Sequence, residues 1–288
     1  ASVKYAFIQS DLSMYDVTLC CRVLEVSTAG YYKALRRGPS SRALRREELA
    51  AKIQAVHAQN RGVYGSPRIY HALKAQGESV CENTVAQVMK QRQIRAKTKK
   101  KFVPRTTDSA HQEPLAGNLL ERQFTAKVPD QKWVVDITYI PTDEGWLYLA
   151  GVMDLCSRKI VGWSMAEHME TSLVSGALTM ALVHRQPPAG LLHHSDRGVQ
   201  YASEDYRHLL ETHAIQPSMS GKGDCWDNAC AESFWATLKG ELVNQEHYAT
   251  REQAQRSIFE YIEVFYNRQR LHSSLGYMSP EAFEAGLN

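Results

Sequence analysis

Residues 133–140 read Trp-Val-Val-Asp-Ile-Thr-Tyr-Ile, a run of β-branched and aromatic side chains interrupted by one acid, Asp136. Such side chains favour extended backbone, whereas Asp is depleted in strands. Two further β-rich runs follow at 146–155 and 159–165. Turn-forming residues separate the three runs, at Asp143-Glu144-Gly145 and Cys156-Ser157-Arg158. We therefore predict three strands joined as hairpins, with Asp136 inside the first of them.

The chain beyond the third strand alternates between helical and extended patterns. We predict helices and short strands in this order: a helix at 171–184, a strand at 190–196, a helix at 203–212, a strand at 215–218, and helices at 228–243 and 251–266. Hairpin strands followed by alternating helix and strand are typical of an α/β fold. The expected architecture is a mixed five-stranded sheet flanked by helices.

The N-terminal third contains helical patterns. Residues 1–40 form a short helical segment that ends in a Gly-Pro-Ser-Ser stop signal. The next helix would place Leu44, Leu49, Ile53 and Val56 on one side. After a turn ending in Pro67, two short helices would bury Ile69, Tyr70 and Leu73, then Val85, Val88 and Met89. Two helices joined by a short Gly-containing turn and followed by basic residues suggest a helix-turn-helix.

Charge is divided unevenly along the chain. Residues 1–108 hold 20 Lys and Arg against 8 Asp and Glu, a net charge of +12, and the remaining residues carry 14 against 23, a net charge of −9. Clustered Lys and Arg attract phosphate backbones. We divide the chain into an N-terminal helical segment (1–40), a helix-turn-helix DNA-binding domain (41–98), a basic linker (99–128), a catalytic core (129–244) and a C-terminal helical extension (245–288).

The composition argues against several classes of protein. No stretch approaches the ~18 consecutive apolar residues of a membrane span. The first ten residues lack the apolar run of a signal peptide. The six Cys residues form no CxxC pair, so we expect a reduced cytoplasmic protein without a zinc site. His193 and His194 make a poor zinc site as well, because no second pair stands at ligand spacing.

Three acids are candidates for a metal-dependent site. Asp136 lies inside a predicted strand, Asp196 ends another, and Glu232 lies in the first turn of a helix. Each acid alone is more often a cap or a solvent-facing residue. Together they would meet at one edge of the sheet and offer the oxygen ligands that Mg²⁺ or Mn²⁺ prefers. Two such ions ~3.5–4 Å apart would stabilise the attacking and leaving oxygens of a phosphodiester.

The spacing of these acids resembles that of a known class. Asp196 and Glu232 are separated by 35 residues, and Lys239 follows seven residues after the Glu, as in integrase-like transposases and retroviral integrases. The segments WVVDITYI, HHSDRGVQY, DNACAESFWATLK and YNRQRLHSSLGYMSPEAF further resemble the second-frame protein of the insertion-sequence-3 family. The segment GVYGSPRIYHAL resembles the inner helix-turn-helix of that family, so the resemblance covers nearly the whole chain.

The resemblance implies an RNase H-like fold and a DNA transposase. It would use Mg²⁺, or Mn²⁺ as a substitute, with two ions per site, to cleave a transposon end and join it through a circular intermediate. Asp136, Asp196 and Glu232 would be both catalytic residues and metal ligands. The expected DNA contacts are Lys239, His194, Arg197, Gln200 and Tyr201 in the core, and Arg68, Thr84, Lys97, Lys99, Lys100 and Lys101 in the basic third.

The implied partners are double-stranded DNA (the transposon ends and the target), further copies of the chain, and the first-frame protein of the same element. The implied location is the bacterial cytoplasm, at the nucleoid. Two other functions remain open from the residues. One is a DNA-binding regulator with an inert core, and the other is an RNase H-like nuclease acting on RNA hybrids, since fold alone does not fix function.

Overall fold

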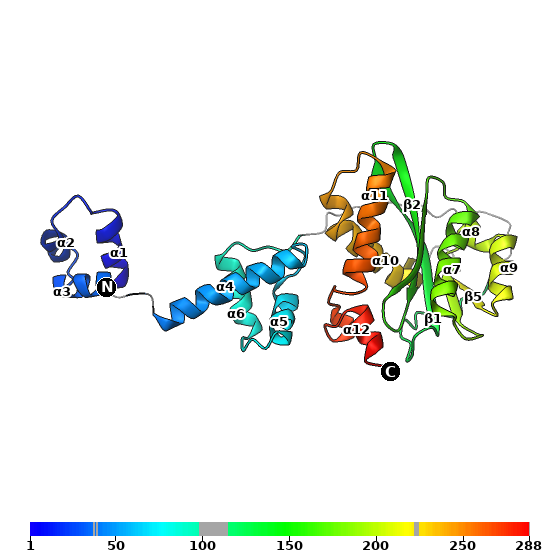
Figure 1. The fold of residues 1–288 in the computed structure, drawn as a ribbon, viewed down its shortest axis with the longest axis horizontal. Helices are drawn as coiled ribbons and strands as arrows, with labels where there is room; N and C mark the ends of the chain where they lie inside the picture. Colours follow the sequence, from blue (N-terminus) through cyan, green and yellow to red (C-terminus); the bar gives the residue numbers. More distant parts are fainter. Residues whose placement is uncertain (37, 39, 98–114, 222–224, 288) are drawn as a thin grey trace.

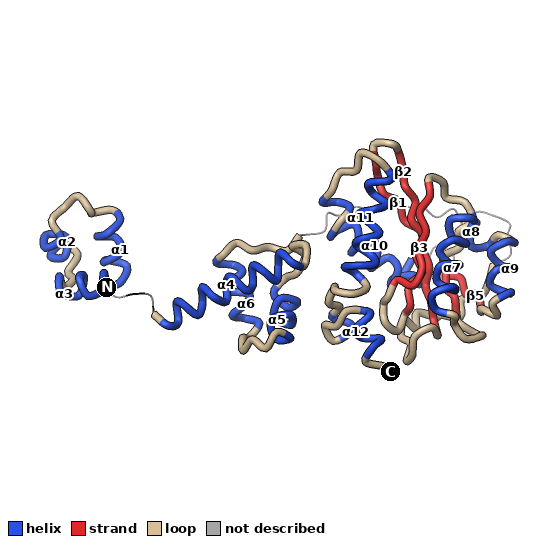
Figure 2. The backbone as a smooth tube through the Cα atoms, in the orientation of Figure 1, coloured by secondary structure: helices blue, strands red, loops and turns tan. Residues whose placement is uncertain are grey.

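The computed structural model describes residues 1–36, 38, 40–97, 115–221 and 225–287. Residues 129–244 are built on one mixed sheet with helices on its faces (Figures 1 and 2). The sheet has five strands in the order β3-β2-β1-β4-β5. The strands are β1 (Lys132–Thr142), β2 (Gly145–Asp154), β3 (Ile160–Ala166), β4 (Leu192–Ser195) and β5 (Gln216–Met219). The first three pair antiparallel, and β4 and β5 add parallel to β1. The predicted mixed five-stranded sheet is confirmed.

Each face of the sheet buries its own apolar cluster. On one side, Val135 and Val152 pack with α7 (Thr171–Arg185), α8 (Val199–Ala202) and α9 (Glu204–Thr212). On the other, Val134 and Leu149 pack with α10 (Ala229–Glu241) and α11 (Arg251–Phe259). Alternate residues of β1 therefore face opposite layers, as the period of a strand requires. The two helical layers lie on either side of the strands in Figure 1.

Helices α4 (Ser41–Gln59), α5 (Ser66–Ala75) and α6 (Glu82–Gln91) form the expected helix-turn-helix region. The inward residues Ile53, Ile69 and Leu73 have no exposed surface. One expectation was wrong, because Leu44 is 49% exposed. The first turns of α4 project beyond α5 and α6, so this residue has no helix to pack against (Figure 1). Residues 1–36 form a separate unit of α1 (Ser2–Ser10), α2 (Val17–Val23) and α3 (Thr28–Arg36).

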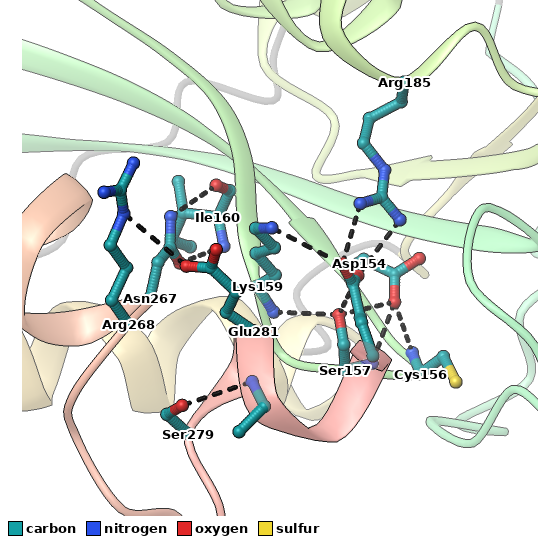
Figure 3. A network of polar contacts seen from close by, with 12 residues as sticks. Asp154, Cys156, Ser157, Lys159, Ile160, Arg185, Asn267, Arg268, Ser279 and Glu281 are labelled. Carbon is teal, nitrogen blue, oxygen red and sulfur yellow. Dashed lines mark hydrogen bonds and ion pairs between the residues drawn. The ribbon is translucent and has the colours of Figure 1, made fainter. Parts of the chain in front are cut away.

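The C-terminal extension wraps back onto the sheet. The 3-10 turns η1 (Cys225–Asn228) and η2 (Val243–Gln245) flank α10. Within the extension, α11 continues as a π-helical turn, η3 (Glu260–Tyr266), and η4 (Ser273–Leu275) leads to α12 (Pro280–Ala285). Asn267 satisfies both backbone groups of Ile160 on edge strand β3, at 2.9 Å each, as another strand would (Figure 3). Arg185 on α7 holds Glu284 of α12 through two bonds of 2.9 and 3.0 Å.

The buried Asp154 closes the same network at the end of β2. It accepts hydrogen bonds from the backbone of Cys156 and Ser157, while Ser157 also donates to Glu284 (Figure 3). Burial raises the pKa of Asp154, and these donors partly offset that rise. The hairpin between β2 and β3 is thereby fixed to the C-terminal helix. Among the described residues, no helix is long and apolar enough to cross a membrane.

Candidate active site

Asp136 lies in the middle of β1, opposite Gly151 of β2. One carboxylate oxygen accepts a hydrogen bond from the backbone N–H of Ile137 at 2.8 Å. The other accepts one at 3.1 Å from the indole N–H of Trp235, which comes from α10. The Trp235 ring lies over Gly151, where a Cβ atom would stand 2.8 Å from it. Strand pairing and this indole together hold Asp136 rigidly.

Asp196 follows directly after β4. The parallel register pairs Val134 with His194, so Asp136 and Asp196 each stand two residues beyond that pair on neighbouring strands. A carboxylate oxygen of Asp196 accepts from the N–H of Gly198 at 3.0 Å. A Cβ on Gly198 would approach that oxygen to 3.1 Å, so the glycine permits the tight turn. The structure thus brings the two Asp residues together on the neighbouring inner strands β1 and β4.

The pKa of Asp136 reflects the nearby carboxylate of Asp196. Burial raises its pKa to about 8, and the charge of Asp196 is the second cause of the rise. Hydrogen bonds from Ile137 and Trp235 act in the opposite direction, and Glu232 adds a smaller repulsive contribution. Two carboxylates that repel one another in a partly dry site favour a proton or a bound cation. The site is therefore short of positive charge.

Glu232 lies in the first turn of α10, as predicted. Its side chain is exposed, and partial desolvation raises its pKa. Within the described ranges, no three Asp, Glu, His or Cys side chains stand close enough together to hold a metal ion. Glu232 lies near enough to Asp136 for its charge to add to the rise in the pKa of Asp136. That all three acids share a metal ion stays a prediction.

Two oxygen atoms beside the carboxylates are buried without a hydrogen-bond partner, Oδ1 of Asn228 and the hydroxyl of Tyr201. Asn228 precedes α10, and its amide nitrogen donates to the carbonyl of Val135, next to Asp136. Burial is the main reason that the pKa of Tyr201 is raised, and the charges of the nearby Asp196 and Asp136 add to the rise. Carboxylate and amide oxygens are the donors that hard divalent cations prefer. The donor set therefore fits Mg²⁺ or Mn²⁺.

Lys239 lies two helical turns beyond Glu232 on α10. Its ammonium stands 4.6 Å from the centroid of the Tyr139 ring, on the same strand as Asp136. Burial lowers the pKa of Lys239, and the charge of Asp136 partly offsets this. The half-buried cation is thus held at the edge of the acidic site.

Three of the expected DNA contacts are buried instead, which corrects those expectations. His194 has no exposed surface, and its ring lies between the hydroxyls of Ser218 and Ser220 at 2.8 and 3.1 Å. Burial lowers its pKa to about 4, so the ring is neutral. Gln200 donates to the carbonyl of Met169 at 2.9 Å, and Tyr201 is 2% exposed. These three side chains are buried, and they support the segment around the end of β4 instead of facing DNA.

Arg68 is also not where a DNA contact was expected. It lies between α5 and the C-terminal extension, donates to the carbonyl of Leu271 at 2.9 Å, and stands 3.8 Å from Glu241. Arg197 donates to the carbonyl of Ser220 at 2.7 Å on the rim of the site. Thr84 lies near the start of α6, and Lys97 is exposed. Both remain predictions, and Lys99, Lys100 and Lys101 lie outside the described residues.

Sequence reasoning missed two residues of the site. The sequence patterns indicate no role for Trp235 at the acids, and they place Asn228 only at the start of the predicted helix. The periodicity of α10 places an aromatic ring on the buried face, but it does not tell that the indole N–H points at Asp136. That contact joins residues 99 positions apart in the chain.

Several known proteins and family models are similar to this chain. Integrase core domain models match residues 126–225 and 213–280, and an HTH-like domain model matches residues 44–102. A transposase of insertion sequence IS3A from Escherichia coli is 44% identical over 98% of both chains. An uncharacterized 31 kDa protein of insertion element IS600 from Shigella sonnei is 46% identical, over 91% of this chain and 96% of that one. A simian T-cell lymphotropic virus intasome structure covers 81% of this chain and 74% of its own at 13% identity, with a TM-score of 0.47.

Proposed function

The chain belongs to the insertion-sequence-3 family of transposases, and we propose that it cleaves DNA at a transposon end and joins the resulting 3′-hydroxyl to DNA. The observation that carries this proposal is the pair of Asp136 and Asp196. They stand at corresponding positions on two adjacent parallel strands, with too little positive charge around them. Such a pair of carboxylates suits chemistry on a phosphodiester, because it can hold metal cations against the negatively charged phosphate.

Mg²⁺ is the cofactor that fits the donor set, with Mn²⁺ as a substitute. Asp136 and Asp196 would hold the ions, and a rotation of the exposed Glu232 side chain would bring in the third carboxylate. We propose two ions per site. When bound, they supply positive charge at the attacking and leaving oxygens of the phosphodiester.

The protein's own residues would orient the metal-binding carboxylate and neutralise the charge of the DNA phosphates. The strand-bound Asp136 keeps a fixed position because Trp235 and Ile137 hold both of its oxygens. Lys239 would contact a DNA phosphate on the side of the site away from Asp196. Its position over Tyr139 keeps the flexible ammonium close to where a phosphate must lie. Arg197 is proposed as a second contact on the rim.

Circle formation followed by integration is proposed for this chain from its family membership. Double-stranded transposon ends and target DNA would be the substrates. We further propose a homo-oligomer that brings two ends together, the first-frame protein of the same element as a partner, and action at the bacterial nucleoid.

A duplex with a pre-cleaved 3′-hydroxyl end tests the reaction class. The duplex carries the terminus of the element that encodes the protein, and Mg²⁺ is present. Joined products support the transposase. Hydrolysis without joining would identify a nuclease, and an RNA–DNA hybrid cut faster than the duplex would identify a hybrid-specific one. Binding without chemistry would leave a DNA-binding regulator and contradict the proposal.

A further inference from the structure

The first 36 residues fold into a unit whose second and third helices are joined by a tight turn. Helix α2 ends at Val23 and α3 begins at Thr28. Within the turn, Glu25 adopts a φ of 52°, in the left-handed region that lets a chain reverse sharply. Two short helices with such a turn between them make a helix-turn-helix. The matched HTH-like model starts only at residue 44, so this unit is a different one.

Local contacts fix this geometry. The side chain of Asp16 caps α2 by accepting from Leu19 N–H at 3.0 Å, and Ser27 caps α3 by accepting from Gly30 N–H at 3.3 Å. Lys4 of α1 donates to the carbonyl of Leu24 in the turn at 2.9 Å. Ile8, Cys20, Cys21 and Tyr31 form the buried core of the unit.

Gly30 permits the close contact between α3 and α1. A Cβ at this position would stand 2.3 Å from the Tyr5 hydroxyl. The hydrophobic residue Tyr31 therefore points into the unit, whereas the opposite side of α3 faces outward. The three helices form one small body with one outward helix face.

That outward face has the composition of a DNA-reading surface. Ala29, Tyr32, Lys33 and Arg36 are exposed and recur at the spacing of one helix face. No acid occurs in α3, and both cations lie in its last turn. Arg and Lys bind phosphates or guanine edges, Tyr offers a hydroxyl, and Ala suits the thymine methyl. The corresponding helix α6 begins with Glu82, so α3 is the less repulsive of the two.

We propose that residues 2–36 are a second DNA-binding module, with α3 entering the major groove of double-stranded DNA. The inference goes beyond the catalytic proposal, since it concerns recognition by a part of the chain that contains no catalytic acid. The contacts with DNA come from Tyr32, Lys33 and Arg36. Ser27 and Thr28, at the start of α3, would enter the groove with the same helix. A chain with two such modules reads a longer stretch of DNA than the α4–α6 domain alone.

A contact with another protein is the competing explanation. Large apolar side chains are exposed on this unit, among them Val3, Phe7, Leu19 and Val23. Those four belong to α1 and α2, whereas the basic face belongs to α3, where Leu35 is the large aliphatic side chain that is exposed, at 44%. The observations on α3 therefore favour DNA, and a protein contact becomes an outcome of the test.

The test uses the full chain with Asp136→Asn, so that DNA is bound but not cut. Fluorescence anisotropy with a labelled duplex of random sequence gives the affinity over a series of salt concentrations. Lys33→Glu and Arg36→Glu should each weaken binding about tenfold and lower the salt slope by about one. Lys127→Glu makes the same charge change at an exposed position of the core and should leave both values near the parent.

A further variant guards against misfolding as the explanation. Tyr32→Ala keeps the charge and should change which sequences are enriched from a randomised duplex pool. Thermal unfolding confirms that the charge variants remain folded.

Parent-like affinity and salt slope in Lys33→Glu and Arg36→Glu would overturn the proposal. So would a change of oligomeric state in sedimentation at unchanged DNA affinity, which would identify α3 as a protein contact. Failure here is distinct from failure of the catalytic proposal. The α3 variants, built on the active parent, should still join ends at saturating DNA, whereas Asp136→Asn should bind but never join.

Discussion

At the scale of single residues, Trp235 does two things at once. Its indole N–H donates to Asp136, and its ring fills the space left by Gly151 on the neighbouring strand. Groups that orient a metal ligand matter nearly as much as the ligand itself. The Trp235 side chain therefore combines a hydrogen-bonding role with a packing role.

Trp235→Phe keeps an aromatic ring but removes the donor. We expect the rate of end joining to fall by about tenfold or more, with DNA affinity unchanged, because Asp136 loses one of its two fixed contacts. Single-turnover joining assays measure this. Trp146→Phe is the matched control, since Trp146 is 47% exposed on β2. A joining rate for Trp235→Phe equal to that of the control would show that the indole only packs.

Lys239 supplies a half-buried positive charge beside the acids. Lys239→Ala should weaken end-specific joining about tenfold while leaving thermal stability nearly unchanged. Lys239→Glu should be worse because it places a negative charge against a phosphate, and Lys239→Arg should recover part of the loss. Lys127→Ala serves as the exposed control. Joining by the Ala variant at the parent rate and limiting DNA would reduce Lys239 to a surface residue.

At the scale of elements, α10 carries both Glu232 and Lys239 and is fixed at its far end by a buried ion pair. Arg270 binds Glu241 through two bonds of 2.8 and 2.6 Å, and Tyr261 donates to the same carboxylate at 2.7 Å. The two charged side chains are 6% and 9% exposed. The C-terminal extension thus holds the helix that presents the rim of the active site.

Removing Arg270 leaves the buried carboxylate of Glu241 with only the more distant Arg68, at 3.8 Å, as a charged partner. We expect Arg270→Met to lower the free energy of unfolding by about 3 kcal/mol or more, measured by urea unfolding. Glu241→Met in addition should recover much of that loss, because the remaining charge is then removed. Arg256→Met, in an exposed pair on α11, should change little. Equal stability of the parent and Arg270→Met would contradict this account of the helix.

Local patterns were enough to predict most of these elements. The strands at 133–140, 146–155 and 159–165 agree with β1, β2 and β3 to within three residues at each end. β-Branched runs and Gly-containing turns act within a few residues, so a single sequence displays them. Asp136 and Asp196 stand out for the same reason, since one interrupts a strand pattern and the other ends one, whereas Glu232 stands out by its spacing from Asp196.

The remaining features depend on contacts between distant segments. His194 looked like a polar residue at a strand end, but Ser218 and Ser220 of the next strand bury its ring. Arg68 looked like a basic residue of a DNA-binding helix, but the C-terminal extension supplies its partners. The π-helical continuation of α11 has no local signal, because its pattern matches an ordinary helix. The periodicity of a single segment does not indicate which distant segment will pack against it.

At the scale of the whole molecule, the α4–α6 domain rests on the C-terminal extension of the core. Tyr64 donates to the carbonyl of Gln269 at 3.1 Å and accepts from Leu271 N–H at 2.8 Å. The rings of His71 and Tyr277 stack with centroids 3.7 Å apart. Arg68 stands beside Glu241, the residue that anchors α10. The α4–α6 domain and helix α10 therefore share one set of contacts.

Buried histidines make the stability of this assembly depend on pH. Burial and the charges of Arg270, Arg68 and Arg158 lower the pKa of His272 to about 3. The unfolded chain takes up this proton near pH 6.5 and the folded chain only near pH 3. The stabilising contribution is therefore complete above pH 6.5 and is lost as the pH falls toward 3.

His272→Gln removes this titration and keeps a hydrogen-bond acceptor for Arg270. In urea unfolding between pH 6.5 and pH 4, its stability should fall less steeply than that of the parent. The difference can reach about 1.4 kcal/mol per pH unit, the value for one proton. The buried His193 and His194 should still give the variant some acid sensitivity. Identical pH slopes for parent and variant would mean that His272 is protonated in the folded protein.

The central claim is that Asp136, Asp196 and Glu232 together carry out Mg²⁺-dependent joining of DNA ends. The most direct test is single-turnover joining of a pre-cleaved transposon end by Asp136→Asn, Asp196→Asn and Glu232→Gln, compared with the parent. Each change is nearly isosteric, so all three variants should fold and bind the duplex like the parent yet form no joined product. A folded variant of any one of them that joins ends at near the parent rate in Mg²⁺ would contradict the claim.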